Sequence, residues 1–222
     1  MKRITALAAA LLLQSAVVTA SITAFAPAAQ AAAVDDEVAQ LQREWELVKY
    51  KTPAAQQEKR FDELAGKAAQ VVAAYPDRAE PLVWQGIIVS SLAGARGGLG
   101  ALSLAKQAKA QYEAALKIAP DVLDGSAYNS LGVLYYKVPG WPIGFGDKAK
   151  AKELLLKALA INPAGIDANY FYAEYLVETG KGAEAVPYLE KALTAPARPG
   201  RAVADAGRRE EAKALLAKVK GA

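Results

Sequence analysis

The chain has 222 residues, with 27 Lys or Arg, 23 Asp or Glu, a formal net charge of +4, and no His or Cys. It therefore lacks the usual general base near neutral pH, the usual thiol nucleophile and the commonest metal ligands. It also cannot form a disulfide, so its stability must come from packing. We expect a non-catalytic protein with no catalytic residues, no bound metal and no cofactor.

The first 31 residues have the pattern of a secretory signal peptide. Lys2 and Arg3 precede an apolar run from Ile4 to Phe25, and Ala29-Gln30-Ala31 supplies an A-x-A cleavage motif. Cleavage would leave residues 32–222 with a formal charge of +2, because Lys2 and Arg3 are removed. So balanced a charge argues against a nucleic-acid partner. We expect a periplasmic or secreted protein that is not a lipoprotein and has no stable membrane insertion; a retained anchor is the alternative.

Four segments of the chain end in nearly the same way. Ala-Leu-Lys-Ile-Ala-Pro ends at Pro120, Ala-Leu-Ala-Ile-Asn-Pro at Pro163, Ala-Leu-Thr-Ala-Pro at Pro196, and Val-Val-Ala-Ala-Tyr-Pro at Pro76. The prolines are 44, 43 and 33 residues apart, which fits a repeat of about 34 residues with about ten residues inserted twice. Each proline is expected to end a helix, because it cannot extend the hydrogen-bond ladder.

Within these repeats, small residues stand where two helices must cross closely. The first helices carry Gly86, Gly132 and Ala173 at the crossing. The second helices carry Ala, a bulky residue and Ala in turn, namely Ala108, Tyr112 and Ala115; Ala151, Leu155 and Ala158; Ala185, Leu189 and Ala192. This pattern resembles the tetratricopeptide repeat family, in a secreted bacterial form. The resemblance implies an all-α, tetratricopeptide-like solenoid of antiparallel helix pairs with two loop insertions.

In chain order, we expect a divergent first hairpin at 35–76, repeats at about 79–120, 125–163 and 166–197, and a C-terminal capping helix at 205–220. Asp35-Asp36-Glu37 is expected to begin the first helix. The capping helix is expected to turn Ala212, Leu215, Leu216 and Val219 inward. Its charged residues are expected to face water, namely Arg208, Arg209, Glu210, Glu211, Lys213 and Lys218.

The first insertion holds four glycines between Gly94 and Gly100. It lacks the Gly-Lys-Ser/Thr ending of a phosphate-binding loop, so that function is excluded. Two interpretations remain. The segment is either a flexible elbow between two lengthened helices, or a site where Arg96 and exposed amides receive an anionic group.

The second insertion, Val138 to Asp147, is the least ordinary segment. Its two prolines and three glycines forbid a helix, yet Trp141, Ile143 and Phe145 are large and apolar. The loop either packs into a gap between helices or subunits, or presents an apolar surface to a ligand or partner. Such a surface could also serve a homo-oligomer.

Aromatic residues concentrate on the first helices of the second and third repeats, which line the concave groove in tetratricopeptide arrays. We expect a scaffold or adaptor that binds a protein or peptide in this groove through aromatic anchors. The predicted partner- or ligand-binding residues of groove and loop are Trp84, Asn129, Tyr136, Lys137, Trp141, Phe145, Tyr170, Glu174 and Glu178. Glu174 and Glu178 stand at helical spacing and are interpreted as a solvated face rather than a catalytic pair.

The segment from Leu134 to Tyr175 supports an alternative function. Its Gly144-Phe145-Gly146-Asp147 turn and its Tyr170-Phe171-Tyr172-Ala173-Glu174-Tyr175 helix are similar to the T component of tripartite periplasmic transporters. That similarity implies a solute-binding or transport accessory protein. An enclosed apolar cavity lined by Trp141, Phe145 and Tyr170 would favour this alternative, whereas an open shallow groove would favour the scaffold.

Overall fold

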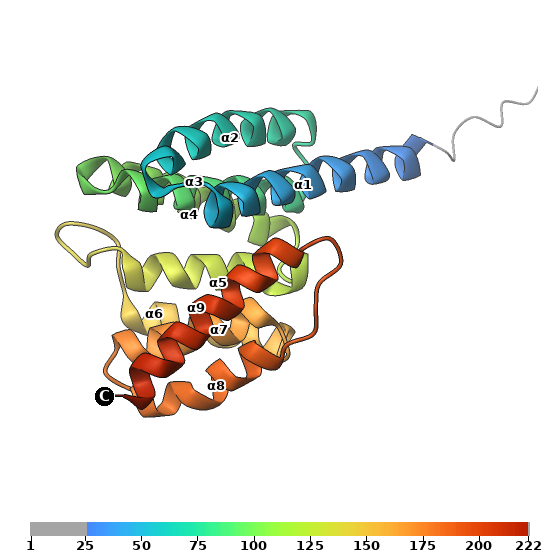
Figure 1. Cartoon of the computed structure of the whole chain (residues 1–222). Coiled ribbons are helices and arrows are strands. Elements are labelled where there is room, and N and C mark those ends of the chain that lie inside the picture. Colours follow the sequence, from blue (N-terminus) through green and yellow to red (C-terminus); the bar gives the residue numbers. More distant parts are fainter. Residues whose placement is uncertain (1–25, 222) are drawn as a thin grey trace, which may run out of the picture.

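A computed structural model describes residues 26–221, which form nine helices and no strand (Figure 1). The predicted signal peptide therefore lies mostly outside the described residues. The helices are α1 (Ala26–Lys51), α2 (Ala54–Ala74), α3 (Ala79–Arg96), α4 (Gly98–Ile118), α5 (Val122–Lys137), α6 (Lys148–Ile161), α7 (Ile166–Glu178), α8 (Gly182–Thr194) and α9 (Ala202–Lys220). Among these described helices, none is both long and apolar enough to cross a membrane.

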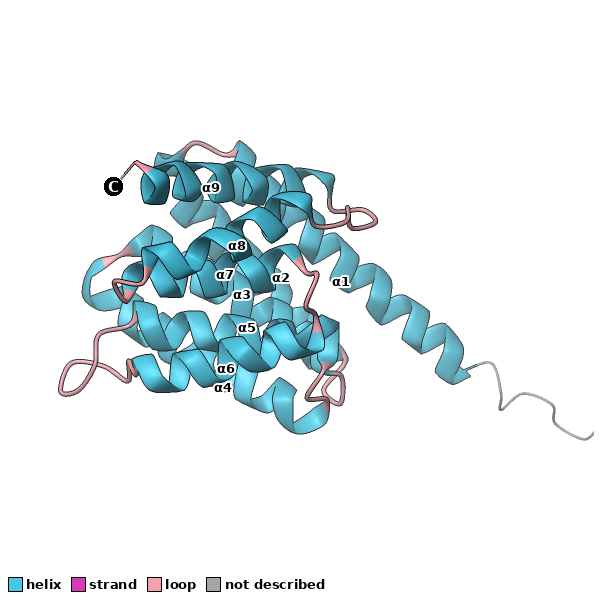
Figure 2. Cartoon of the chain, turned by 90° about the horizontal axis from the view of Figure 1, so that it is seen from below, coloured by secondary structure: helices cyan, strands magenta, loops and turns pink. Residues whose placement is uncertain are grey.

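Successive helices pack as hairpin pairs, α1 with α2, α3 with α4, α5 with α6 and α7 with α8, and the pairs stack on one another (Figures 1 and 2). Gly86 of α3 lies against the Tyr112 ring of α4, and Gly132 of α5 lies against Leu155 of α6. These close approaches are the crossings that the small residues predict. The all-α, tetratricopeptide-like solenoid expected from the sequence is confirmed.

The four recurring prolines mark helix ends. Helices α2, α4, α6 and α8 end two residues before Pro76, Pro120, Pro163 and Pro196, and the residue between is the C-cap in each case. The residue before a proline is disfavoured in the helical region, so the chain turns there. The repeated string is therefore one structural signal used four times.

In the first half of the chain, one expectation is wrong, and the glycine-rich insertion matches one of its two interpretations, the elbow between two lengthened helices. The first helix begins at Ala26 and passes through Asp35-Asp36-Glu37 without a break, so this acidic run does not begin it. The glycine-rich insertion is absorbed into α3 and α4, which meet at Gly97 with a φ of 64°. Arg96 donates to Glu58 (2.9 Å) and Asp62 (3.2 Å) of α2, so its guanidinium serves helix packing and not an anion site.

The last helix crosses back over the array. In Figure 1, α9 runs diagonally in front of α5 and α7, and it contacts α1, α7 and α8. Gly207 lies directly against the Tyr50 ring of α1, where a Cβ atom would have no room. This close approach brings the first and last described helices together and covers the inner face of the stack.

Two glycine-to-alanine substitutions should have opposite effects on stability. In Gly132→Ala the new Cβ would lie 2.8 Å from Leu155 Cγ, whereas Gly66 of α2 has no atom within 4 Å of the corresponding position. We expect Gly132→Ala to lower the free energy of unfolding by about 1–3 kcal/mol. Gly66→Ala should raise it by about 0.5–1 kcal/mol, because alanine is the better helix former. Urea denaturation followed by circular dichroism measures both, and equal effects would contradict the proposed helix crossing.

Candidate functional site

A cavity of about 300 Å³ lies between the first helices of the pairs and the segment 198–211. We call it the capped chamber. Helices α1, α3, α5 and α7 supply its inner wall, and the start of α9 with the preceding loop supplies its cover. Its lining includes Trp45, Lys49, Tyr50, Trp84, Ile87, Ser90, Asn129, Val133, Lys137, Asp167, Tyr170, Phe171, Glu174, Arg198, Arg201, Arg208 and Glu211.

Paired charges hold the cover in place. Asp167 of α7 accepts hydrogen bonds from Arg198 Nη1 (2.7 Å) and Arg208 Nε (2.8 Å). Asp205 accepts from the backbone N–H (2.8 Å) and Nε (2.7 Å) of Arg198. Burial opposes ionisation of Asp167, but the charges of Arg208 and Arg198 outweigh it and lower its pKa to about 2. Asp167 is therefore an ionised anchor at neutral pH.

A second anchor joins the cover to the first helix. Glu46 of α1 is buried, and its carboxylate accepts from the backbone N–H of Ala204 (3.1 Å) and from Arg201 Nε (3.5 Å). The Arg201 guanidinium lies over the Trp84 ring at 4.9 Å, measured to the ring centroid. This cation–π contact places Arg201 in the chamber wall.

The expectation that Arg208 faces water is wrong. Arg208 is only 7% exposed, and its guanidinium lies 4.5 Å from the centroid of the Tyr170 ring and 4.3 Å from that of the Phe171 ring. Glu211 accepts a hydrogen bond from it as well. The capping helix thus turns a charged face inward, because the opposite wall supplies both aromatic faces and the Asp167 carboxylate.

Five of the nine predicted binding residues line the capped chamber, namely Trp84, Asn129, Lys137, Tyr170 and Glu174. Two more border it. The hydroxyl of Tyr136 is buried and donates to Glu174 Oε2 (2.5 Å), and Glu178 accepts a hydrogen bond from Lys137. These side chains bind one another, which fixes the geometry of this end of the chamber.

Trp141 and Phe145, the other two, lie outside the chamber lining. Trp141 is 91% exposed and Ile143 67%, whereas Phe145 packs edge-on against Tyr135 with ring centroids 5.6 Å apart. We call residues 138–147 the Trp141 loop; it projects beyond the ends of α5 and α6 (Figure 1). The structure therefore does not unite this loop with Tyr136 and Tyr170 in one surface.

Backbone bonds fix the Trp141 loop at its base. The N–H of Gly146 donates to the Pro139 carbonyl (2.9 Å), and that of Asp147 donates to the Tyr135 carbonyl (2.8 Å). The Asp147 carboxylate caps α6 by accepting from the N–H groups of Ala149 (2.8 Å) and Lys150 (3.0 Å). One part of the loop is thus packed, and another presents large apolar side chains to solvent.

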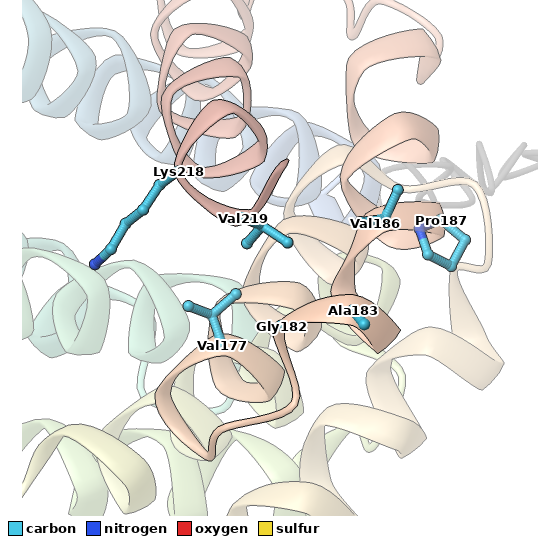
Figure 3. A pocket seen from close by; sticks show the side chains of 7 residues that line it. All are labelled: Val177, Gly182, Ala183, Val186, Pro187, Lys218 and Val219. Carbon is cyan, nitrogen blue, oxygen red and sulfur yellow. The ribbon is translucent and has the colours of Figure 1, made fainter. Parts of the chain in front are cut away.

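A second hollow, of about 730 Å³, opens to solvent between the start of α8 and the end of α9 (Figure 3). Its lining is almost wholly apolar and consists of Val177, Gly182, Ala183, Val186, Pro187, Lys218 and Val219. Ligand sites combine apolar walls with a few convergent polar groups, and this hollow offers only one charged side chain. The capped chamber is the better candidate for a small ligand.

The sequence interpretation missed the three arginines of the cover, although one signal pointed to two of them, Arg201 and Arg208. Arg201, Asp205, Arg208 and Ala212 follow one another at spacings of four, three and four, which is a single helical stripe. All four are buried. A stripe that mixes charged residues with alanine indicates a helix face buried against partners of opposite charge.

No protein-family model and no curated protein matches this chain. Among solved structures, it is similar to TTC0263, a thermophilic tetratricopeptide protein of Thermus thermophilus, with 14% identity, a TM-score of 0.55 and coverage of 82% of this chain and 98% of that one. It is also similar to MamA, with 19% identity, a TM-score of 0.44 and coverage of 75% and 90%. The TTC0263 likeness supports the tetratricopeptide-like fold and nothing finer.

Removal of the Asp167 carboxylate should change how stability depends on pH. The pKa of Asp167 lies below its ordinary value of 3.8, so its contribution is present above about pH 4 and is lost as the pH falls toward 2. We expect Asp167→Asn to lower the free energy of unfolding at pH 7 by about 1–3 kcal/mol and to flatten the stability curve between pH 4 and 2.

The control is Asp62→Asn, which removes an exposed partner of Arg96. It should cost less than about 1 kcal/mol. Urea denaturation at a series of pH values gives both curves. If the free energy of unfolding of Asp167→Asn fell between pH 4 and 2 as steeply as that of the unsubstituted protein, this role of Asp167 would be contradicted.

Proposed function

We propose that this protein is a non-catalytic interaction scaffold that binds a partner protein through the Trp141 loop. The observation that carries the proposal is the near-complete exposure of Trp141 on a loop that backbone bonds fix at its base. Tryptophan is among the residues that most often carry the binding energy of an interface. A loop already fixed in place loses little conformational entropy when a partner binds.

The surroundings of the Trp141 loop indicate the chemistry of that partner. Lys109 lies 5.8 Å from the Phe145 centroid, and Leu102 Cδ1 lies 3.3 Å from the point where a Cβ atom on Gly144 would stand, so this face of α4 borders the loop. Lys106, on the same helix between them, and Lys148, next to the loop, are both exposed. We therefore propose a partner with an apolar pocket for Trp141 and Ile143 and an acidic rim.

The concave groove predicted to hold a peptide is covered by α9. This supports partner contact outside the groove. The main chamber carboxylates are engaged, since Asp167 binds two arginines and Glu174 binds Tyr136 and Lys137. The pairing of Asp167 supports a non-catalytic role, because the two arginines lower its pKa to about 2 and so make it a weak base near neutral pH.

The double variant Trp141→Ala, Ile143→Ala should lose the partner and keep the fold. Both side chains are exposed, so we expect the melting temperature to change by no more than about 2 °C. A photo-crosslinking residue at the exposed position 149, beside the loop, should join the partner in the otherwise unsubstituted protein and fail to do so in the double variant. Mass spectrometry then identifies the joined protein.

The matched control is Leu47→Ala, Leu156→Ala, which removes two exposed apolar side chains elsewhere. It should leave the crosslink unchanged. Equal losses in both double variants would contradict a role for the Trp141 loop. If the only crosslinked product were a second copy of the chain, the Trp141 loop would serve self-association and not a partner protein. Analytical ultracentrifugation would then detect the oligomer.

We further propose that the protein is exported and cleaved near Ala31. The basic start, the apolar run and the A-x-A motif support this proposal. Protein recovered from a bacterial periplasmic extract should have a new N-terminus near Ala32, and Ala29→Leu, Ala31→Leu should accumulate as the longer precursor. Uncleaved protein confined to the cytoplasm would contradict export.

A further inference from the structure

Two residues that line the capped chamber each contain a buried polar atom with no hydrogen-bond partner among the described residues. The atoms are Trp84 Nε1, a donor, and Asn129 Oδ1, an acceptor. Their residues are 5% and 6% exposed. The neighbouring Trp45 differs, because its Nε1 donates to Ser91 Oγ at 2.8 Å. An unpaired buried polar atom is costly, so each one requires an explanation.

The charge of Arg201 is also poorly compensated. Among the described residues, the Arg201 side chain donates one hydrogen bond, from Nε to the Glu46 carboxylate at 3.5 Å. Glu46 also accepts a hydrogen bond from the backbone N–H of Ala204. Burial and the nearby positive charge of Arg198 both lower the pKa of Arg201. The Arg201 guanidinium lies over the Trp84 ring, and its remaining N–H groups can donate hydrogen bonds to an anionic group.

The remaining wall is suited to a flat apolar body. Trp45, Tyr170 and Phe171 contribute aromatic rings, and Ile87 and Val133 contribute aliphatic surface. The volume of about 300 Å³ is at the lower end of the range for ligand pockets. A volume of this size suits a small molecule.

We propose that the capped chamber binds a small aromatic hydroxy-carboxylate. The carboxylate accepts hydrogen bonds from Arg201 and Trp84 Nε1, the ring packs among the aromatic side chains, and the hydroxyl donates to Asn129 Oδ1. Each group of this ligand thus has a matching group among the residues that line the chamber. The proposal is independent of the Trp141 loop, so the two can fail separately.

The probe is 4-hydroxyphenylacetate, added to ¹⁵N-labelled full-length protein. The chain has three tryptophans, so three indole N–H signals are expected, and Trp→Phe variants assign them. The Trp84 signal should move and saturate below about 10 mM ligand, as expected for a small molecule of this size. The signal of Trp141, outside the chamber, should stay fixed and serves as the internal control.

Two ligand analogues test the charge and the hydroxyl. 4-Hydroxyphenylacetamide lacks the charge, and phenylacetate lacks the hydroxyl. Each should bind at least about fivefold more weakly than 4-hydroxyphenylacetate, because each leaves one chamber group without its partner. Isothermal titration calorimetry measures the three affinities.

Two matched variants test the chamber wall. Asn129 and Gln85 are both buried amides with an unpartnered oxygen, but only Asn129 lines the chamber. Asn129→Leu should weaken binding of 4-hydroxyphenylacetate at least about tenfold, and Gln85→Leu should change it by less than about twofold. Circular dichroism melting shows that each variant is folded.

Three results would overturn the proposal. They are a Trp84 signal that does not move up to about 10 mM ligand, equal binding of the acid and its amide, and equal losses in Asn129→Leu and Gln85→Leu. The variant Trp141→Ala, Ile143→Ala should bind the acid as well as the unsubstituted protein does. A positive result there would stand even if the Trp141 loop bound no partner.

Discussion

The contact of α9 with α1 and α7 is the constraint on which the rest of the structure depends. In a solenoid each repeat normally contacts only its neighbours, yet here Glu46 on the first helix binds the start of the last one. Asp167 adds bonds to Arg198 and Arg208. The Glu46–Arg201 pair is the more buried of these contacts, and removal of one partner of a buried pair leaves a desolvated charge without compensation. Ion pairs and hydrogen bonds between charged side chains therefore hold α9 against α1 and α7, and closure of the array does not depend on a larger apolar core.

Closure divides the molecule into two regions with different chemistry. The inner face, which an open array would offer to an extended peptide, becomes a small chamber with aromatic walls and buried arginines. The outer Trp141 loop keeps its apolar side chains in solvent while Phe145 and the Asp147 cap hold its base. An interior of this size suits a small molecule, and an exposed tryptophan suits a protein surface. The two proposed binding functions follow from this division.

The sequence predicted the local features of the fold well because they depend on neighbouring residues. Pro76, Pro120, Pro163 and Pro196 mark helix ends, and Gly86 and Gly132 mark crossings. The same spacing placed Asn129, Tyr170 and Glu174 on the inner wall. It did not place the cover, because Glu46 and Arg201 are 155 residues apart and no periodicity links them. Arg208 was assigned to solvent since charged residues usually are, and its partners Asp167 and Tyr170 lie on a distant helix.

The most direct test of this account is a distance measurement between the first and last helices. The chain has no cysteine, so Leu47→Cys, Lys213→Cys gives two unique and exposed sites for spin labels. Pulsed electron paramagnetic resonance should give one narrow distance distribution, and adding Glu46→Ala and Asp167→Ala should broaden it. A broad distribution in the otherwise unsubstituted protein would show that α9 does not close the array, and the capped chamber would then not exist.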